Sequence, residues 1–222
     1  MKEDVNMAAC PREYWNRVAG KKEFPLPVPL ELLKAHVALD SQILEVGCGY
    51  GRVLALLKEN GYTALSGVDF AEEMIACAKE RLPDCAFQVN SGSRLPYDDE
   101  SSDAVVIVAV LTCIVSDDGQ RALLAEANRV LRPGGALVLA DFLINSDARN
   151  LARYETGHAR YGTYGVFELD EGVALRHHDA AWIQELAAPF NQVAYEEHVF
   201  PTMNRHTSNG FHYLGRKGAG DV

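Results

Sequence analysis

The sequence predicts an α/β fold around a mostly parallel sheet, and three observations support this. Short apolar, strand-like runs alternate with helical patterns, at residues 43–46, 64–69, 86–89, 104–108 and 136–141. Strands that alternate with helices pair in parallel through right-handed crossovers. The run VVIVAV at 105–110 is apolar without alternation, which is typical of a central strand covered on both faces. Two final runs, 193–200 and 211–216, are joined by a loop too short for a crossover helix, so they should pair antiparallel.

The first helical patterns have recognisable ends. Val53, Leu56 and Leu57 form one apolar face of a helix that follows the first strand. Gly61 can end this helix in a left-handed conformation. A second helix is expected over residues 72–81.

The later helices are expected to begin at acidic residues. Asp117 or Asp118 can cap a helix that runs to about Leu131, before the Pro-Gly-Gly sequence at 133–135 breaks it. Asp179 can cap the last helix, which precedes the final pair of strands.

Composition limits the class of protein. The chain has 222 residues, enough for one sizeable domain, and a net charge of −10. This charge argues against nucleic acid and against an anionic membrane as main partners, because both require a basic surface. No apolar run is long enough to span a bilayer, and the N-terminus lacks a secretory signal. The five cysteines have no CxxC spacing, so we expect a cytoplasmic protein without disulfides or a metal site.

A glycine-rich sequence follows the first strand. Residues 45–51 read EVGCGYG, and such glycines let backbone N–H groups approach a ligand. The spacing is GxGxG, not the dinucleotide fingerprint GxGxxG, and no phosphate-binding GK[ST] follows. Asp69 ends the second strand, where a carboxylate can accept both hydroxyls of a ribose. These residues leave a nicotinamide dinucleotide and S-adenosylmethionine as candidate ligands.

Four motifs in order then carry a resemblance to a known family. They are EVGCGYG (45–51), GVDFAEEMIACAKE (67–80), SGSRLPYDDESSDAVVIVAVL (91–111) and RVLRPGGALVLAD (129–141). Together they resemble the class I S-adenosylmethionine-dependent methyltransferases, in their small-molecule branch, over residues 42–142. The resemblance implies a Rossmann-like three-layer sandwich. Its seven-stranded, mostly parallel sheet would have the order 3-2-1-4-5-7-6, with strand 7 antiparallel.

The resemblance also implies roles for individual residues in binding S-adenosylmethionine. The methionine part would lie against Glu45, Gly47, Cys48 and Gly49, with Gly51 permitting the turn into the helix. Asp69 would hold the ribose. The adenine would contact Phe70 and Met74 on its faces and Ser91, Gly92 and Ser93 at its edge. Val108 and Ala109 would lie near the sulfonium.

The sequence departs from the family pattern at two places. Family members often carry Asp where Ser91 stands, and serine accepts a hydrogen bond less strongly than a carboxylate. They also often carry Asn at 109 and His at 112 or 113, where this chain has Ala109, Thr112 and Cys113. No imidazole base is therefore expected from that loop.

The organisation expected for the chain is a single methyltransferase domain over residues 1–222. It would comprise an N-terminal flap and helix (1–40), the cofactor-binding core (41–142), a substrate lid (143–178) and a final helix with a β-hairpin (179–222). The lid is the long connection before the last helix, expected to be either functional or disordered. The candidate catalytic residues are Tyr14, His158, Tyr161, Arg176 and His177.

The predicted function is methyl transfer from S-adenosylmethionine to a small-molecule acceptor by in-line displacement, with S-adenosylhomocysteine as product. One alternative is a protein that binds S-adenosylmethionine without catalysis, which the missing base at 109–113 favours. Another is an NAD-dependent oxidoreductase. The sequence predicts neither the acceptor nor the oligomeric state.

Overall fold

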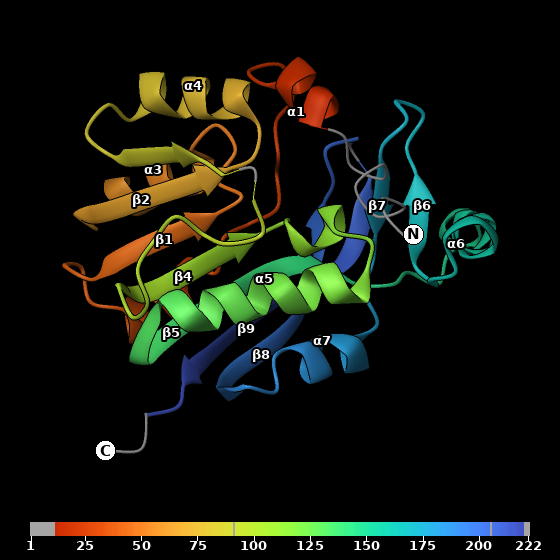
Figure 1. Cartoon of the computed structure of the whole chain (residues 1–222). Helices are drawn as coiled ribbons and strands as arrows, with labels where there is room; N and C mark the ends of the chain where they lie inside the picture. Colours follow the sequence, from red (N-terminus) through yellow and green to blue (C-terminus); the bar gives the residue numbers. More distant parts are fainter. Residues whose placement is uncertain (1–11, 91, 205, 220–222) are drawn as a thin grey trace.

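The computed structural model describes residues 12–90, 92–204 and 206–219, and within them a seven-stranded sheet has the order β3-β2-β1-β4-β5-β9-β8 (Figure 1). Its strands are β1 (Gln42–Val46), β2 (Ala64–Asp69), β3 (Ala86–Val89), β4 (Ser102–Val108), β5 (Leu131–Phe142), β8 (Phe190–Pro201) and β9 (Thr207–Lys217). The first five pair in parallel, and β9 lies antiparallel between β5 and β8. The expected order is confirmed, because β8 and β9 are the sixth and seventh strands of this sheet along the chain.

Helices cover both faces of the sheet and complete a three-layer sandwich. One face packs against α2 (Leu30–His36), α3 (Arg52–Glu59) and α4 (Glu72–Arg81), and the other against α5 (Asp117–Val130) and α7 (Ala180–Leu186). Successive residues of β4 alternate between the two cores: Val106 belongs to the first and Val105 and Ile107 to the second. All three are fully buried, which explains the continuous apolar run in the sequence.

The ends of α5 differ from the sequence prediction. The cap is Ser116, whose Oγ accepts a hydrogen bond from the Gly119 N–H at 3.2 Å, so the expected cap at Asp117 or Asp118 is wrong. Asp117 instead lies in the first turn and pairs with Arg176 at 2.6 Å. The Pro-Gly-Gly sequence does not separate α5 from β5 either, because β5 begins at Leu131 and contains these residues at an irregularity in its pairing with β4.

The segment 143–178 is largely regular structure rather than an irregular connection. It forms α6 (Ala148–Tyr161) and an antiparallel hairpin of β6 (Val166–Glu168) and β7 (Ala174–Arg176). The Asp147 carboxylate caps α6, and Gly162 ends it in a left-handed conformation. Figure 1 shows α6, β6 and β7 beyond the carboxyl ends of the parallel strands.

The N-terminal segment crosses the same end of the sheet. It contains α1 (Arg12–Val18), which packs on α4, and an extended stretch before α2. Residues 1–11 of the expected flap lie outside the described residues. None of the helices described is both long and apolar enough to cross a membrane.

Candidate cofactor and acceptor site

The glycine loop between β1 and α3 adopts a conformation that requires its glycines. Gly47, Gly49 and Gly51 have φ angles of 72°, 52° and 77°, in the left-handed region that side chains rarely enter. A Cβ at Gly47 would also overlap the side chain of Val110. The loop therefore brings bare backbone to the carboxyl ends of β1 and β4.

Asp69 ties this loop to the end of β2. Its Oδ2 accepts a hydrogen bond from the Gly49 N–H and its Oδ1 one from the Ala71 N–H, both at 2.9 Å. Burial raises the pKa of Asp69, and the backbone N–H groups oppose this shift. A carboxylate offers about four acceptor positions, so Asp69 keeps acceptor capacity for a ligand.

Glu45 is the second buried carboxyl group at the site. It is 2% exposed, and its Oε2 has no hydrogen-bond partner among the described residues. Burial raises the pKa of Glu45 well above its usual range, while the charge of Arg52 opposes the rise. An orphaned acceptor of this kind fits a ligand that supplies a donor, such as an ammonium group.

A cavity of about 190 Å³ opens beside these carboxyl groups. One wall consists of predicted cofactor residues from the ends of β1, β2 and β4 and the start of α4: Glu45, Gly47, Cys48, Gly49, Asp69, Phe70, Met74, Val108 and Ala109. Ala109 has a φ of 57°, a left-handed conformation for which Asn is favoured over Ala.

Gly51, Gly92 and Ser93 do not line this cavity. Gly51 faces α4, where a Cβ would lie 3.4 Å from the Ala78 Cβ. Gly92 and Ser93 are exposed. Ser91 lies outside the described residues.

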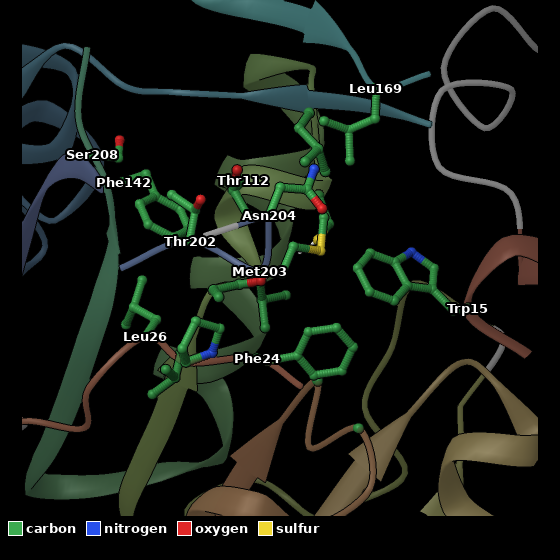
Figure 2. Close-up of a pocket in the computed structure, with 18 of the residues that line it drawn as sticks. Trp15, Phe24, Leu26, Thr112, Phe142, Leu169, Thr202, Met203, Asn204 and Ser208 are labelled. Atoms are coloured by element: carbon green, nitrogen blue, oxygen red, sulfur yellow. Dashed lines mark hydrogen bonds between the residues drawn. The ribbon is translucent and has the colours of Figure 1, made fainter. Parts of the chain in front are cut away.

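The opposite wall comes from five segments. Its members are Trp15, Phe24, Pro25 and Leu26 near the N-terminus, Phe142 at the end of β5, Arg149, Asn150 and Arg153 on α6, Phe167, Leu169, Leu175 and His177 around β6 and β7, and residues 202–204 and 206–208 of the β8–β9 turn and the start of β9. Figure 2 shows Trp15 and Phe24 on one side, Phe142 and Ser208 on the other, and Met203 between them. Of the candidate catalytic residues predicted from the sequence, only His177 belongs to this wall.

Two of the candidate catalytic residues lie away from the cavity lining. Tyr14 is 2% exposed, and its hydroxyl lies 3.2 Å from Lys22 Nζ. Burial raises the pKa of Tyr14. His158 is exposed on α6.

Two more are engaged in other contacts. Tyr161 donates a hydrogen bond to Glu168, and Arg176 forms the ion pair with Asp117 that fixes the start of α5 to β7. Neither lines the cavity. The fifth candidate, His177, lines the cavity.

His177 is buried against the cavity. Its Nδ1 lies 2.6 Å from the Tyr154 hydroxyl, and its ring packs edge-on against Phe167. Burial lowers the pKa of His177 well below its usual range, and the charge of Arg153 adds to this. His177 is therefore neutral at physiological pH.

The possibility of a metal site concerns a different part of the sheet. Glu196, His198 and His212 on β8 and β9 place possible ligand atoms within 4.8 Å of one another. None of them lines the cavity. His178, which follows His177 in the chain, uses both ring nitrogens in contacts with Gln120 and the Phe142 carbonyl.

Comparison with known proteins agrees with the fold and the motifs. A family model described as a methyltransferase domain matches residues 44–139. The phthiotriol/phenolphthiotriol dimycocerosates methyltransferase of Mycobacterium tuberculosis is 33% identical over 147 residues, which cover 58% of this chain and 53% of that protein. The demethylmenaquinone methyltransferase of Beutenbergia cavernae is 40% identical over 101 residues, covering 46% and 40%.

Two further matches extend this comparison. The tRNA N(3)-methylcytidine methyltransferase of Schizosaccharomyces pombe is 30% identical over 154 residues, covering 60% of this chain and 50% of that protein. The crystal structure of a methyltransferase from Methanosarcina mazei superposes with a TM-score of 0.79 at 24% identity, covering 84% of this chain and 97% of that one. The chain spans about half the length of the curated relatives it matches.

The four motifs, the sheet order and these matches together define the class. Over residues 44–139 the chain carries a methyltransferase domain with the motifs and sheet order of the class I S-adenosylmethionine-dependent methyltransferases, for which S-adenosylmethionine is the cofactor.

Proposed function

We propose that this protein transfers a methyl group from S-adenosylmethionine to a small molecule held in the cavity between the glycine loop and the α6–β7 segment. This proposal rests on one observation: the predicted cofactor residues and the residues of the α6–β7 segment line the same cavity. Its inner wall holds the predicted cofactor residues, and the surface of the cavity as a whole is mostly apolar. A concave, mostly apolar site with a few polar groups is typical of small-molecule binding.

The residues of the inner wall fit the cofactor. The orphaned Oε2 of Glu45 would accept a hydrogen bond from the ammonium of the methionine part. Asp69 would accept from the ribose hydroxyls, since its hydrogen bonds to backbone N–H groups leave acceptor capacity free. Gly47 and Gly49 allow close backbone approach.

S-adenosylmethionine supplies an electrophilic methyl group on a positively charged sulfur. When bound, it would give this methyl group to a lone pair of the acceptor atom, and the electron pair of the broken carbon–sulfur bond would stay on sulfur. The protein contributes by holding the acceptor in line and excluding water, which lowers the barrier by several kcal/mol. Phe24, Phe142 and Phe167 line the cavity and suit the exclusion of water.

A small acceptor suits this protein better than a nucleic acid. The cavity is lined on one side by α6 and the β8–β9 turn, and the net charge of −10 argues against binding of a phosphate backbone. Because one relative is named as a tRNA methyltransferase, the test includes RNA.

The test begins with calorimetric titration of the purified protein with S-adenosylmethionine and S-adenosylhomocysteine, with NAD as control. Micromolar binding of the sulfur ligands alone is expected. Transfer of a labelled methyl group to a panel of small molecules and to total tRNA then follows. Labelling of tRNA alone would overturn the small-molecule assignment, and cofactor binding without transfer to any acceptor would favour the non-catalytic alternative.

A further inference from the structure

Asn145 has a fixed side-chain orientation beside the cavity. Its Oδ1 accepts a hydrogen bond from the Asn209 N–H at 2.9 Å, and its Nδ2 donates to the Leu143 carbonyl at 3.1 Å. The backbone N–H can only donate and the backbone carbonyl can only accept, so the oxygen and nitrogen of the Asn145 amide cannot be exchanged. Asn145 therefore presents donors, not acceptors, to its other neighbours.

This orientation determines where the proton of Tyr154 lies. The Tyr154 hydroxyl oxygen accepts from the Asn145 N–H at 3.3 Å and lies 3.4 Å from Asn145 Nδ2, which is also a donor. The hydroxyl proton is therefore left for His177 Nδ1, at 2.6 Å. Asn145 Nδ2 lies 3.2 Å from the same nitrogen.

The chain of hydrogen bonds fixes the tautomer of His177. Nδ1 is an acceptor, and the ring is neutral because burial lowers its pKa, so the proton is on Nε2. Nε2 has no hydrogen-bond partner among the described residues, and His177 lines the cavity. His177 thus offers the cavity an N–H donor and has no lone pair there for use as a general base.

Arg153 brings a positive charge to the same part of the cavity. Its guanidinium carbon lies 3.6 Å from the centre of the Phe167 ring, and its Nε is buried without a hydrogen-bond partner in the described chain. Arg149, one turn earlier on α6, also lines the cavity but is exposed. Neither arginine forms an ion pair with a described residue.

The neighbouring carboxylates form no ion pair with Arg153. The charge of Asp147 acts on Arg153, but the Asp147 carboxylate accepts its hydrogen bonds from Asn150. Glu168 pairs with Arg160 at 2.7 Å, and Glu171 pairs with Lys22 at 2.5 Å. Asp170, at the tip of the β6–β7 turn, is exposed. A guanidinium without a carboxylate partner and an unpaired N–H donor suit an anionic oxygen group, with which they form charge-assisted hydrogen bonds.

We propose that the acceptor is an apolar or aromatic molecule with an anionic group, such as a carboxylate, which Arg153 and the Nε2–H of His177 bind together. The anion anchors the acceptor at the α6 side of the cavity and leaves the atom to be methylated toward Ala109. His177 is a positioning residue, not a base. This inference rests on the proposed function, because it assigns the acceptor half of the same cavity.

The test uses the full chain saturated with S-adenosylhomocysteine and titrates it with matched pairs of probes: benzoate and benzamide, 1-naphthoate and 1-naphthamide. At least one carboxylate should bind about tenfold tighter than its neutral amide. Arg153→Met should remove this preference, because it keeps the apolar stem and loses the charge, and it should weaken carboxylate binding far more than amide binding. Arg132→Met is the matched control, since it removes one positive charge beside Asp103, outside the cavity lining.

His177 is tested by a spectroscopic signature as well as by binding. Long-range ¹H–¹⁵N correlation should show the neutral Nε2–H tautomer in the wild type, and Tyr154→Phe should disturb it. His177→Gln, which can place an N–H near the same point, should keep more of the carboxylate preference than His177→Leu. A neutral Nδ1–H tautomer would overturn the role of His177.

The outcomes separate this inference from the function it rests on. Equal affinity for carboxylates and amides, or no effect of Arg153→Met, would overturn the anionic acceptor while leaving methyl transfer intact. Loss of S-adenosylhomocysteine binding in Arg153→Met would show that this arginine holds the cofactor instead, and would also overturn the inference. Failure of the wild type to bind S-adenosylhomocysteine would refute the proposed function itself.

Discussion

Asp69 Oδ2 accepts a hydrogen bond from the Gly49 N–H at 2.9 Å, so the carboxylate that ends β2 holds the glycine loop that follows β1. One side chain thus has two tasks, since it shapes the backbone cradle and faces the cavity. Variants of Asp69 should therefore affect cofactor binding and stability together.

Asp69→Ala should weaken S-adenosylhomocysteine binding by roughly tenfold to a hundredfold, because it removes charge-assisted hydrogen bonds and frees the loop. It should also lower the free energy of unfolding by about 1–3 kcal/mol, because the Gly49 and Ala71 N–H groups lose their partner. Calorimetry and urea unfolding give the two values. Ser91→Ala should have a smaller effect on binding, and equal, small effects of both variants would count against the assignment of Asp69.

Gly47→Ala should lower the free energy of unfolding by more than left-handed backbone strain alone would. The residue has a φ of 72°, and a Cβ would also overlap Val110. Gly134 is a matched control, since its φ is 76° and nothing lies within 4 Å of a Cβ there. Gly134→Ala should cost about 1–2 kcal/mol from strain, and Gly47→Ala at least ~1 kcal/mol more from overpacking.

A second variant checks the cause of that difference. Val110→Ala in the Gly47→Ala background should recover part of the lost unfolding free energy, because it removes the overlapping methyl groups. If Gly47→Ala and Gly134→Ala are equally stable, close packing of the loop on Val110 is not what requires glycine at this position.

The sheet and the cofactor wall could be predicted from the sequence because their signals are local. Alternating strands and helices give the parallel core, and the glycine loop and Asp69 lie in contiguous motifs. The helix α6 gave no such signal. Its buried residues are Asn150, Tyr154 and Gly157, so it has no aliphatic stripe, and an interior glycine lowers helix propensity.

The acceptor wall could not be predicted because it is assembled by tertiary packing. Trp15, Phe142 and Met203 are far apart in sequence and meet only where α1, β5 and the β8–β9 turn converge (Figure 2). Adjacent residues also diverge: Arg176 points to Asp117, whereas His177 lines the cavity. Alternation along a strand explains this difference, but the sequence could not show which residue faces inward.

His178 should make stability depend on pH in a defined window. Burial lowers the pKa of His178 to about 3, and its ordinary value is 6.5. Between these values the unfolded chain binds more protons, so this residue stabilises the fold above pH 6.5 and the contribution is lost as pH falls toward 3. The slope is at most about 1.4 kcal/mol per pH unit.

The effect of His178 must be measured as the difference in unfolding free energy between the wild type and a His178 variant, because Asp141 changes stability with pH in the opposite direction. Burial raises the pKa of Asp141 to about 7 from 3.8, so its contribution is lost as pH rises through that range. His178→Asn cannot titrate but keeps a donor for the Phe142 carbonyl. Urea unfolding from pH 7.5 to 4.5 should show a wild-type advantage that shrinks with falling pH, and a constant difference would contradict this assignment.

Gly157→Ala should separate acceptor binding from cofactor binding. Gly157 lies on α6 where a Cβ would overlap the Val166 carbonyl, so the substitution should push α6 away from β6. Arg149, Asn150 and Arg153 would move with the helix, while the glycine loop lies on other elements. We expect binding of carboxylate probes to weaken at least about tenfold and S-adenosylhomocysteine affinity to change by less than about threefold. Ala159→Gly, on an exposed position of α6, controls for helix propensity at a cost of about 1 kcal/mol.

Limited proteolysis reports the docking of α6 directly. Cleavage within residues 145–178 should slow when S-adenosylhomocysteine and a carboxylate probe are both bound, and Gly157→Ala should lose this protection. Equal loss of both ligands in Gly157→Ala would mean that α6 supports the whole cavity rather than its acceptor half.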